Sequence, residues 1–292
     1  MKKHRIIINA DDLGMSGEVN AAIEKAITAG CISSSTIMAN APAFEDAIRI
    51  AKLYPHISFG VHLNIDEFKP LTDTSVFMKY GMLDTDGAFK KEYLHNTDIS
   101  FNDDLLDAIY KEWKAQVKKV IDAGVIPSHF DSHEHTHGIF ELQPMYIKLL
   151  KGYCVKRTRR QPYSSMLGMV AVKFMHLNKQ VKSDIKPLSS EGLQPKKRHS
   201  FIYRRLQQFL HSYRHRRWIH DLKEEDFVMT DYFDSYQKFC LCYPKLLKYC
   251  RIGTVELMTH PGHKGYLSEG EMLMNKELQK VCPYELINYN QL

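Results

Sequence analysis

A repeated unit, an apolar strand followed by an amphipathic helix, is the feature that most constrains how this chain can fold. Residues 4–10 include three consecutive isoleucines, and such a continuous apolar run is typical of strands buried on both faces of a parallel sheet. A helix is expected next, because Ser16 can cap its start, apolar residues recur at helical spacing, and Gly30 can end it.

The same unit recurs along the chain. Further strands are expected at residues 33–39, 57–63, 126–130 and 253–259, and further helices at residues 43–53, 103–123, 140–151 and 234–249. Repeated strand–helix units predict a parallel sheet, and a barrel gives such a sheet no open edge. We therefore expect an α/β fold, a (β/α) barrel in one domain over residues 1–292.

Two segments interrupt this pattern. Residues 66–102 lack helical or strand periodicity and are expected to form a loop excursion on the face where strands end, which is where functional insertions tend to lie. Residues 151–220 hold 17 lysines and arginines against Asp184 and Glu191, in a chain whose net charge is +6. A basic region with at least one amphipathic helix should therefore pack on an acidic body.

Composition limits the class of protein. With 292 residues and 44% hydrophobic content, the chain can bury a sizeable core, which excludes a disordered chain. The six cysteines are scattered without a C-x-x-C pair, so reduced thiols in the cytoplasm are expected. Asp11 and Asp12 interrupt the first apolar run before a signal peptide core is complete, and no stretch approaches about 18 apolar residues. We expect a soluble, cytoplasmic protein that does not enter a membrane.

The densest group of potential metal ligands is the run Asp131-Ser132-His133-Glu134-His135-Thr136-His137. If the preceding strand continued through it, Asp131, His133, His135 and His137 would share one face, because side chains two apart in a strand point the same way. A histidine-rich turn can also be no more than a polar strand end. The rest of the chain must therefore show whether the run holds a metal.

Polar side chains follow four of the expected strands at the point where each ends. They are Asp11 with Asp12, His62, His133 and His260. Taken singly, an aspartate there can be a helix cap and a histidine can be a satisfied core residue. In a parallel barrel they would converge on one mouth. Two imidazoles and one carboxylate would leave a position open for water, a second aspartate could take a proton, and a histidine could donate one.

Four motifs in order resemble the signature of the YdjC-like carbohydrate deacetylase family. They are NADDLG at residues 9–14, GVHLN at 60–64, DSHEHTH at 131–137 and ELMTHPG at 256–262. The resemblance covers roughly residues 4–150 and 226–265. It implies a distorted (β/α) barrel of the polysaccharide-deacetylase type and hydrolysis of N-acetyl groups from carbohydrates such as chito-oligosaccharides, with one divalent metal ion.

The resemblance also implies roles by position. Asp12, His62 and His133 would be the metal ligands, Asp11 the general base and His260 the general acid. The supporting or substrate-binding groups would be Asp131, His135, His137 and an arginine after the histidine motif, which is Arg157 or Arg159. The sequence does not choose between the two arginines. Family resemblance favours Mg²⁺ and the histidine ligands favour Zn²⁺ or a similar ion. The family resemblance also implies a homodimer.

Two other functions fit parts of the sequence. The same ligand set serves metal-dependent phosphoesterases and other amidohydrolases, because a motif does not fix the bond that is cleaved. The basic residues 151–220, with aromatic residues among them, could bind nucleic acid or an anionic surface. A solvated helix face or a dimer contact is the more common origin of such a charge run, so nucleic acid is not the expected partner.

Overall fold

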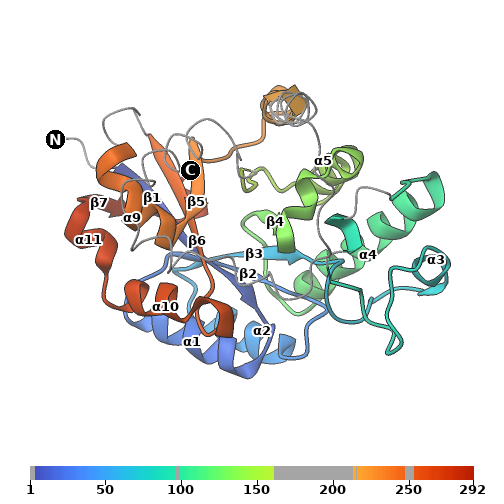
Figure 1. The fold of residues 1–292 in the computed structure, drawn as a ribbon, viewed down its shortest axis with the longest axis horizontal. Helices are drawn as coiled ribbons and strands as arrows, with labels where there is room; N and C mark the ends of the chain where they lie inside the picture. Colours follow the sequence, from blue (N-terminus) through green and yellow to red (C-terminus); the bar gives the residue numbers. More distant parts are fainter. Residues whose placement is uncertain (1–3, 92, 96–98, 161–212, 215, 247–252) are drawn as a thin grey trace, which may run out of the picture.

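Seven parallel strands form the centre of the fold (Figure 1). The computed structural model describes residues 4–91, 93–95, 99–160, 213–214, 216–246 and 253–292. Within them the strand order is β4-β3-β2-β1-β6-β5, and β7 also pairs with β1. The strands are β1 (His4–Leu13), β2 (Ser34–Ile37), β3 (Ser58–Leu63), β4 (Phe130–Ser132), β5 (Tyr232–Ser235), β6 (Thr254–Thr259) and β7 (Tyr284–Leu286).

The sheet curls into a half-barrel. Every strand pair in it is parallel, as the repeated strand–helix unit predicts. Beyond β4 the sheet continues through two isolated bridges, from Phe130 to Thr158 and from Arg157 to Val228. The expected α/β fold with parallel strands and barrel-like curvature is therefore confirmed.

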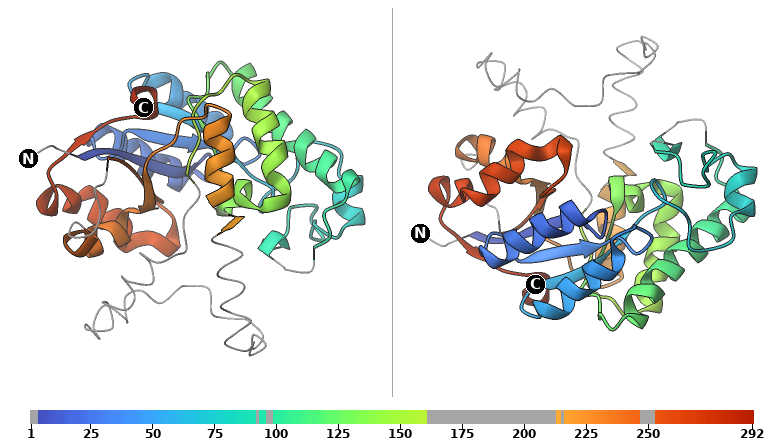
Figure 2. Two further views of the ribbon diagram at one scale, coloured as in Figure 1. Left: turned by 90° about the horizontal axis from the view of Figure 1, so that it is seen from above. Right: turned by 90° about the horizontal axis from the view of Figure 1, so that it is seen from below.

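Helices cover the outside of the sheet, with α1 beside α2 and α4 beside α5 (Figure 2). The helices are α1 (Gly17–Thr28), α2 (Phe44–Leu53), α3 (Ser75–Lys79), α4 (Asp103–Asp122), α5 (Gln143–Gly152), α9 (Tyr236–Leu246), α10 (Leu267–Met274) and α11 (Glu277–Val281). Ser16 caps α1 by accepting a hydrogen bond from the backbone N–H of Val19, and Asn102 caps α4 in the same way from Leu105. These caps fix where the two helices begin.

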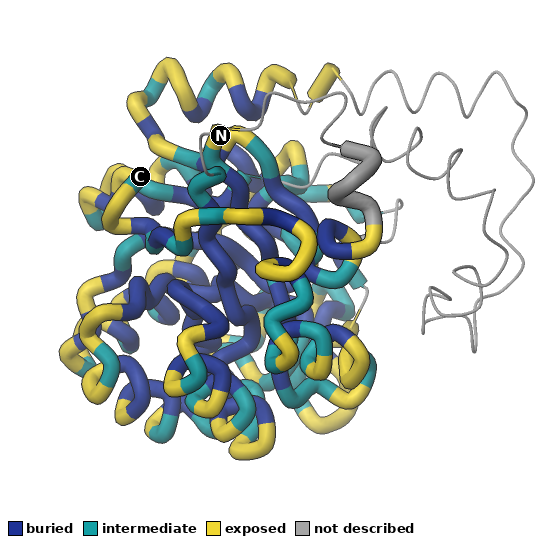
Figure 3. Tube along the Cα trace, turned by 90° about the vertical axis from the view of Figure 1, so that its left-hand side faces the viewer, coloured by how far each residue is buried: buried dark blue, intermediate teal, exposed yellow. Residues whose placement is uncertain are grey.

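The buried residues concentrate on the strands and on the inner faces of the helices (Figure 3). Trp113 of α4 packs edge-on against Tyr146 of α5, with ring centroids 6.2 Å apart. Tyr146 also meets Trp218 at 6.0 Å, and Trp218 is fully buried in a helical stretch at residues 216–224. This end of the basic segment therefore packs on the body as expected, whereas residues 161–212 lie outside the described part.

The loop excursion is only partly irregular. It contains the short helix α3 and a single turn of 3₁₀ helix at Tyr93–His95, and Phe77 of α3 is buried against Phe89 with ring centroids 5.1 Å apart. Among the described residues, no helix is long and apolar enough to cross a membrane.

The run from residue 131 to residue 137 differs from the strand geometry considered for it. Strand β4 ends at Ser132, and a 3₁₀ turn follows over His133–Gly138. Glu134 and His135 adopt left-handed conformations, with φ of 48° and 55°. A chain that turns in this way cannot keep alternate side chains on one face, so the expectation of one shared histidine face is wrong.

Candidate metal centre and active site

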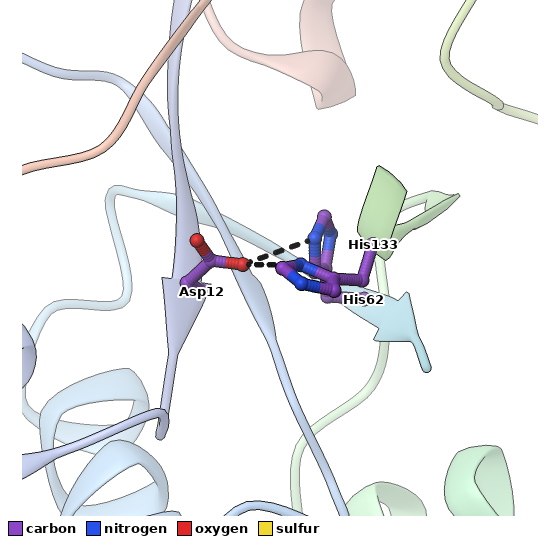
Figure 4. Close-up of side chains that lie close together, drawn as sticks. All are labelled: Asp12, His62 and His133. Carbon is purple, nitrogen blue, oxygen red and sulfur yellow. Dashed lines mark hydrogen bonds and ion pairs between the residues drawn. The ribbon is translucent and has the colours of Figure 1, made fainter. Parts of the chain in front are cut away.

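The polar side chains that the sequence places at strand ends meet at the carboxyl edge of the half-barrel. Asp12 lies on β1, His62 on β3, and His133 directly follows β4. Oδ1 of Asp12 lies 3.3 Å from Nε2 of His62 and 3.0 Å from Nδ1 of His133 (Figure 4). All three residues are buried, so these contacts are shielded from bulk water.

A local irregularity in β1 brings two successive aspartates into one site. Successive side chains of a regular strand point to opposite faces. The pairing of β1 with β2 shifts register between Ala10 and Leu13, and Asp12 has a φ of 68°. Such a bulge re-aims side chains, which allows Asp11 and Asp12 to contribute to the same cluster.

Hydrogen bonds orient the ring of His62. Its Nδ1 lies 2.7 Å from Oδ1 of Asp131, and Thr36 donates its hydroxyl to Oδ2 of the same carboxylate at 3.1 Å. Because a carboxylate only accepts, Nδ1 donates to Asp131, and Nε2, which is also protonated while the ring is charged, faces Asp12. Burial disfavours a charged ring, but Asp131 and Asp12 outweigh it and raise the pKa of His62 to about 10.

The group formed by Asp12, His62 and His133 fits a divalent metal ion. One ligand atom from each residue lies within 4.8 Å of the others. The negative surroundings that raise the pKa of both histidines would also favour a bound cation. Asp11, His62 and Asp131 form a second group by the same distance. Two members of that group, Asp11 and Asp131, already pair with an arginine, whereas the three residues of the first group have no such cationic partner among the contacts of the described residues.

That arginine is Arg159, which is fully buried. Its Nη2 and Nη1 lie 2.6 Å and 2.7 Å from the two carboxylate oxygens of Asp11, and Nη1 also lies 2.9 Å from Asp131. Burial alone would raise the pKa of Asp11, but Arg159 outweighs it and holds the pKa well below its usual range. Asp11 is therefore ionised, and Asn9 donates to its Oδ1 at 2.8 Å.

Arg157 takes a different position. Its Nη2 donates to the carbonyl of Asn290 at 3.3 Å, on the C-terminal segment. The choice that the sequence leaves open between Arg157 and Arg159 is therefore made by the structure, which brings Arg159 to the aspartates.

His260 follows β6 and approaches the cluster from another strand end. Oε2 of Glu269 lies 3.2 Å from Nδ1 of His260 and accepts its backbone N–H at 2.8 Å, and the ring stacks on Tyr266 with centroids 4.2 Å apart. Burial lowers the tendency of the ring to be charged, but Glu269 and the aspartates outweigh it and raise the pKa of His260 to about 9. The ring is therefore in its doubly protonated, positively charged form at neutral pH.

The other two histidines of the cluster have separate environments. His137 is fully buried, and its Nδ1 lies 2.6 Å from the hydroxyl of Ser132, so it holds the turn together. His135 is only partly buried and meets Phe233 edge-on, with centroids 5.5 Å apart. Burial, with Arg159 nearby, lowers the pKa of His135 to about 3, so this ring is neutral.

Three polar residues of the site were not singled out from the sequence. Thr36 orients Asp131, Glu269 holds His260, and Glu256 binds Arg159 through Oε1 at 2.7 Å. Glu256 stood within the last motif and Glu269 at the start of a helix, but neither position distinguishes a site residue from an ordinary acidic one. Contacts between distant segments reveal them.

The protein is thus an α/β protein of the parallel half-barrel class, with a candidate metal centre of one aspartate and two histidines at the carboxyl ends of its strands. The family model for YdjC-like protein matches residues 5–283, so the chain belongs to that family. The resemblance of the four motifs is confirmed.

Several proteins named carbohydrate deacetylase are similar to about half of this chain. Relatives from Thermoanaerobacter pseudethanolicus, Halalkalibacterium halodurans and Vibrio cholerae are 31%, 32% and 33% identical over 148, 151 and 153 residues. The matches cover 51%, 51% and 52% of this chain and 57%, 61% and 57% of those proteins. The chain therefore matches less than two thirds of the length of these relatives.

The fold is similar to a crystal structure from Enterococcus faecalis of a protein assigned to cellobiose-phosphate cleavage. The TM-score is 0.68, the sequence identity is 19%, and the likeness covers 99% of both chains. At this identity the likeness concerns the fold.

Proposed function

We propose that this protein is a metal-dependent hydrolase that removes N-acetyl groups from acetylated carbohydrates such as chito-oligosaccharides. The observation that carries the proposal is the pairing of two adjacent aspartates with different partners. Asp12 faces His62 and His133, while Asp11 faces Arg159. One aspartate is thus placed to hold a cation and the other to act as a base. The carbohydrate deacetylase relatives support the same reaction class.

Asp12, His62 and His133 would hold the metal, with Asp131 fixing the ring of His62. A divalent ion bound there would polarise the acetyl carbonyl and lower the pKa of water. Mg²⁺ and Zn²⁺ are the candidates, and elemental analysis of protein purified without added metal would distinguish them. The cytoplasmic location and the homodimer stay predictions.

Asp11 would take the proton of the attacking water, because it is ionised and held by Arg159 and Asn9. His260 would donate its proton to the departing amine, with Glu269 keeping the ring charged. A C–O bond forms, the C–N bond breaks, and acetate and an amino sugar leave. His135, neutral and partly exposed, would contact substrate from the side of Phe233.

The test is acetate release from N,N'-diacetylchitobiose. Asp11→Asn and His260→Ala should each lower kcat by about 10²–10⁴-fold, the usual contribution of a general acid or base, while metal content stays near that of the unaltered protein. Full activity in both variants would remove the proposed roles. Release of phosphate from phosphomonoesters without acetate release would favour a phosphoesterase instead.

A further inference from the structure

Glu256 is a fully buried acid on β6 that none of the roles above uses. Its Oε1 accepts the Nε–H of Arg159 at 2.7 Å. The guanidinium directs its other two nitrogens at Asp11, at 2.6 Å and 2.7 Å, and Nη1 also contacts Asp131 at 2.9 Å. Arg159 therefore lies between Glu256 on one side and the proposed base on the other, with the ring of Phe233 5.0 Å from its central carbon.

The second oxygen of Glu256 accepts the hydroxyl of Tyr289. This leaves Oε1 directed at Arg159. Tyr289 is fully buried, its ring stacks on His129 with centroids 3.5 Å apart and planes 10° apart, and its backbone N–H donates to Ser58 at 3.2 Å. The stacked ring and the backbone hydrogen bond therefore fix the position from which the phenol hydroxyl of Tyr289 donates to Glu256.

The C-terminal segment that carries Tyr289 is itself tied to the body. A capping box joins Asn288 and Gln291 around the 3₁₀ turn Tyr289–Gln291. Asn288 also donates to the carbonyl of His56 at 3.1 Å, and Arg5 donates to the carbonyl of Gln291 at 2.6 Å. These contacts hold Tyr289 beside Glu256, the partner of the buried Arg159. Tyr289 lies beyond residue 283, where the family match ends.

We infer that Glu256 and Tyr289 are positioning residues, which fix Arg159 so that both of its Nη atoms face the carboxylate of Asp11. A guanidinium is planar and rigid, so holding Nε sets the direction of the Nη pair. Tyr289 holds Glu256 in turn, and neither residue contacts Asp11 itself. The inference rests on the proposed function, because it assigns these residues to the group that would accept the proton.

Glu256→Gln and Tyr289→Phe are the test variants. The Gln side chain can turn its amide NH₂ toward Nε, and its neutral oxygen accepts the Nε–H more weakly than a carboxylate does, so this variant loosens the hold on Nε. The second variant keeps the ring stacked on His129 but removes the hydroxyl. Each should lower kcat for acetate release by about tenfold, since displacement of about 1 Å in a catalytic group costs up to a hundredfold. KM and metal content should stay within about twofold of the unaltered protein, because no substrate or metal contact is lost.

Tyr236→Phe is the matched control. Tyr236 is also buried, and its hydroxyl accepts the backbone N–H of Leu278, on α11. Its loss should affect stability and leave kcat unchanged. If Tyr236→Phe lowers kcat as much as Tyr289→Phe does, the effect is general loosening of the fold and the inference is overturned.

A double-mutant cycle separates positioning of Asp11 from other effects. In an Asp11→Asn background the base is gone, so Tyr289→Phe should have almost no further effect on the residual kcat. An undiminished tenfold loss in that background, or no loss of kcat in either single variant, would overturn the inference.

A crystal structure of Glu256→Gln provides a measure that does not depend on activity. At least one Nη–Oδ contact between Arg159 and Asp11 should open beyond about 3.5 Å, past hydrogen-bond distance. If the unaltered protein releases no acetate, the proposed function fails and this structure decides the inference alone. Both contacts retained at their present lengths would then reject it.

Discussion

Arg159 and Asp11 form a bidentate ion pair, in which the two Nη atoms of the arginine lie 2.6 Å and 2.7 Å from the two carboxylate oxygens of the aspartate. The same guanidinium also pairs with Asp131 and Glu256. Arg159→Met would leave buried carboxylates without their cation. The free energy of unfolding should therefore fall by about 3–5 kcal/mol, as when one partner of a buried ion pair is removed. Urea denaturation at neutral pH measures it.

Arg157→Met is the control for that prediction. Arg157 is two residues away and donates to a backbone carbonyl at 3.3 Å. Losing this contact should cost about 0.5–1.5 kcal/mol, the net value of an ordinary hydrogen bond. Equal losses in both variants would contradict the assignment of Arg159 as the buried partner of the aspartates.

Metal binding should stabilise the folded protein. At a metal concentration a hundredfold above Kd, the gain is about 2.7 kcal/mol, or about 4–8 °C in Tm for a chain of this size. Differential scanning fluorimetry with Mg²⁺ and with Zn²⁺ checks the shift. It should disappear in His133→Ala, because Asp12 and His62 alone make a weaker site.

His56→Ala is the matched histidine control, because His56 is exposed and lies outside the cluster. Its Tm should rise with metal as in the unaltered protein. Loss of the shift in His56→Ala, or its retention in His133→Ala, would place the metal elsewhere.

The pH dependence of kcat should report His260. Its pKa is raised to about 9, so the proton needed for donation is present at neutral pH and is lost as the pH rises through that value. Glu269 on α10 and the aspartates Asp11 and Asp12 on β1 face the ring, and Tyr266 stacks on it. Glu269→Gln removes the nearest charge, so the alkaline limb should move to lower pH and kcat at pH 8 should fall by about tenfold.

Glu271→Gln tests whether any loss of charge on α10 has this effect. Glu271 lies on the same helix and is exposed, so screening by water should leave the alkaline limb in place. An alkaline limb that does not move in Glu269→Gln would remove His260 as the proton donor.

The strand-end positions could be predicted because they depend only on residues that are adjacent in the sequence. A polar residue after an apolar run marks the carboxyl end of a parallel strand, and this pattern located Asp12, His62 and His260. The chain could not show which arginine reaches Asp11, because Arg157 and Arg159 are two residues apart and alternation gives them the same face.

Two other features depend on contacts that no local pattern describes. The left-handed backbone at Glu134 and His135, within the turn that follows β4, is uncommon for residues other than glycine. Tyr289 reaches Glu256 across 33 positions of sequence, and β7, only three residues long, gives too little periodicity to be recognised before it. Folding brings these segments together, so their roles follow from the structure.

Gly60 on β3 packs so closely against His129 that a side chain there should destabilise the fold. A Cβ there would lie 2.7 Å from the backbone oxygen of His129 and 2.6 Å from its ring, which Tyr289 holds by stacking. Gly60→Ala should therefore lower the free energy of unfolding by about 1–3 kcal/mol, as overpacking does. Gly270→Ala is the control: it lies in α10 with nothing within 4 Å of a new Cβ. It should stabilise the protein by about 0.5–1 kcal/mol, because alanine restricts the unfolded chain more than glycine. Chemical denaturation of both variants measures the difference, and equal effects would mean that β3 and β4 separate readily enough to admit a methyl group.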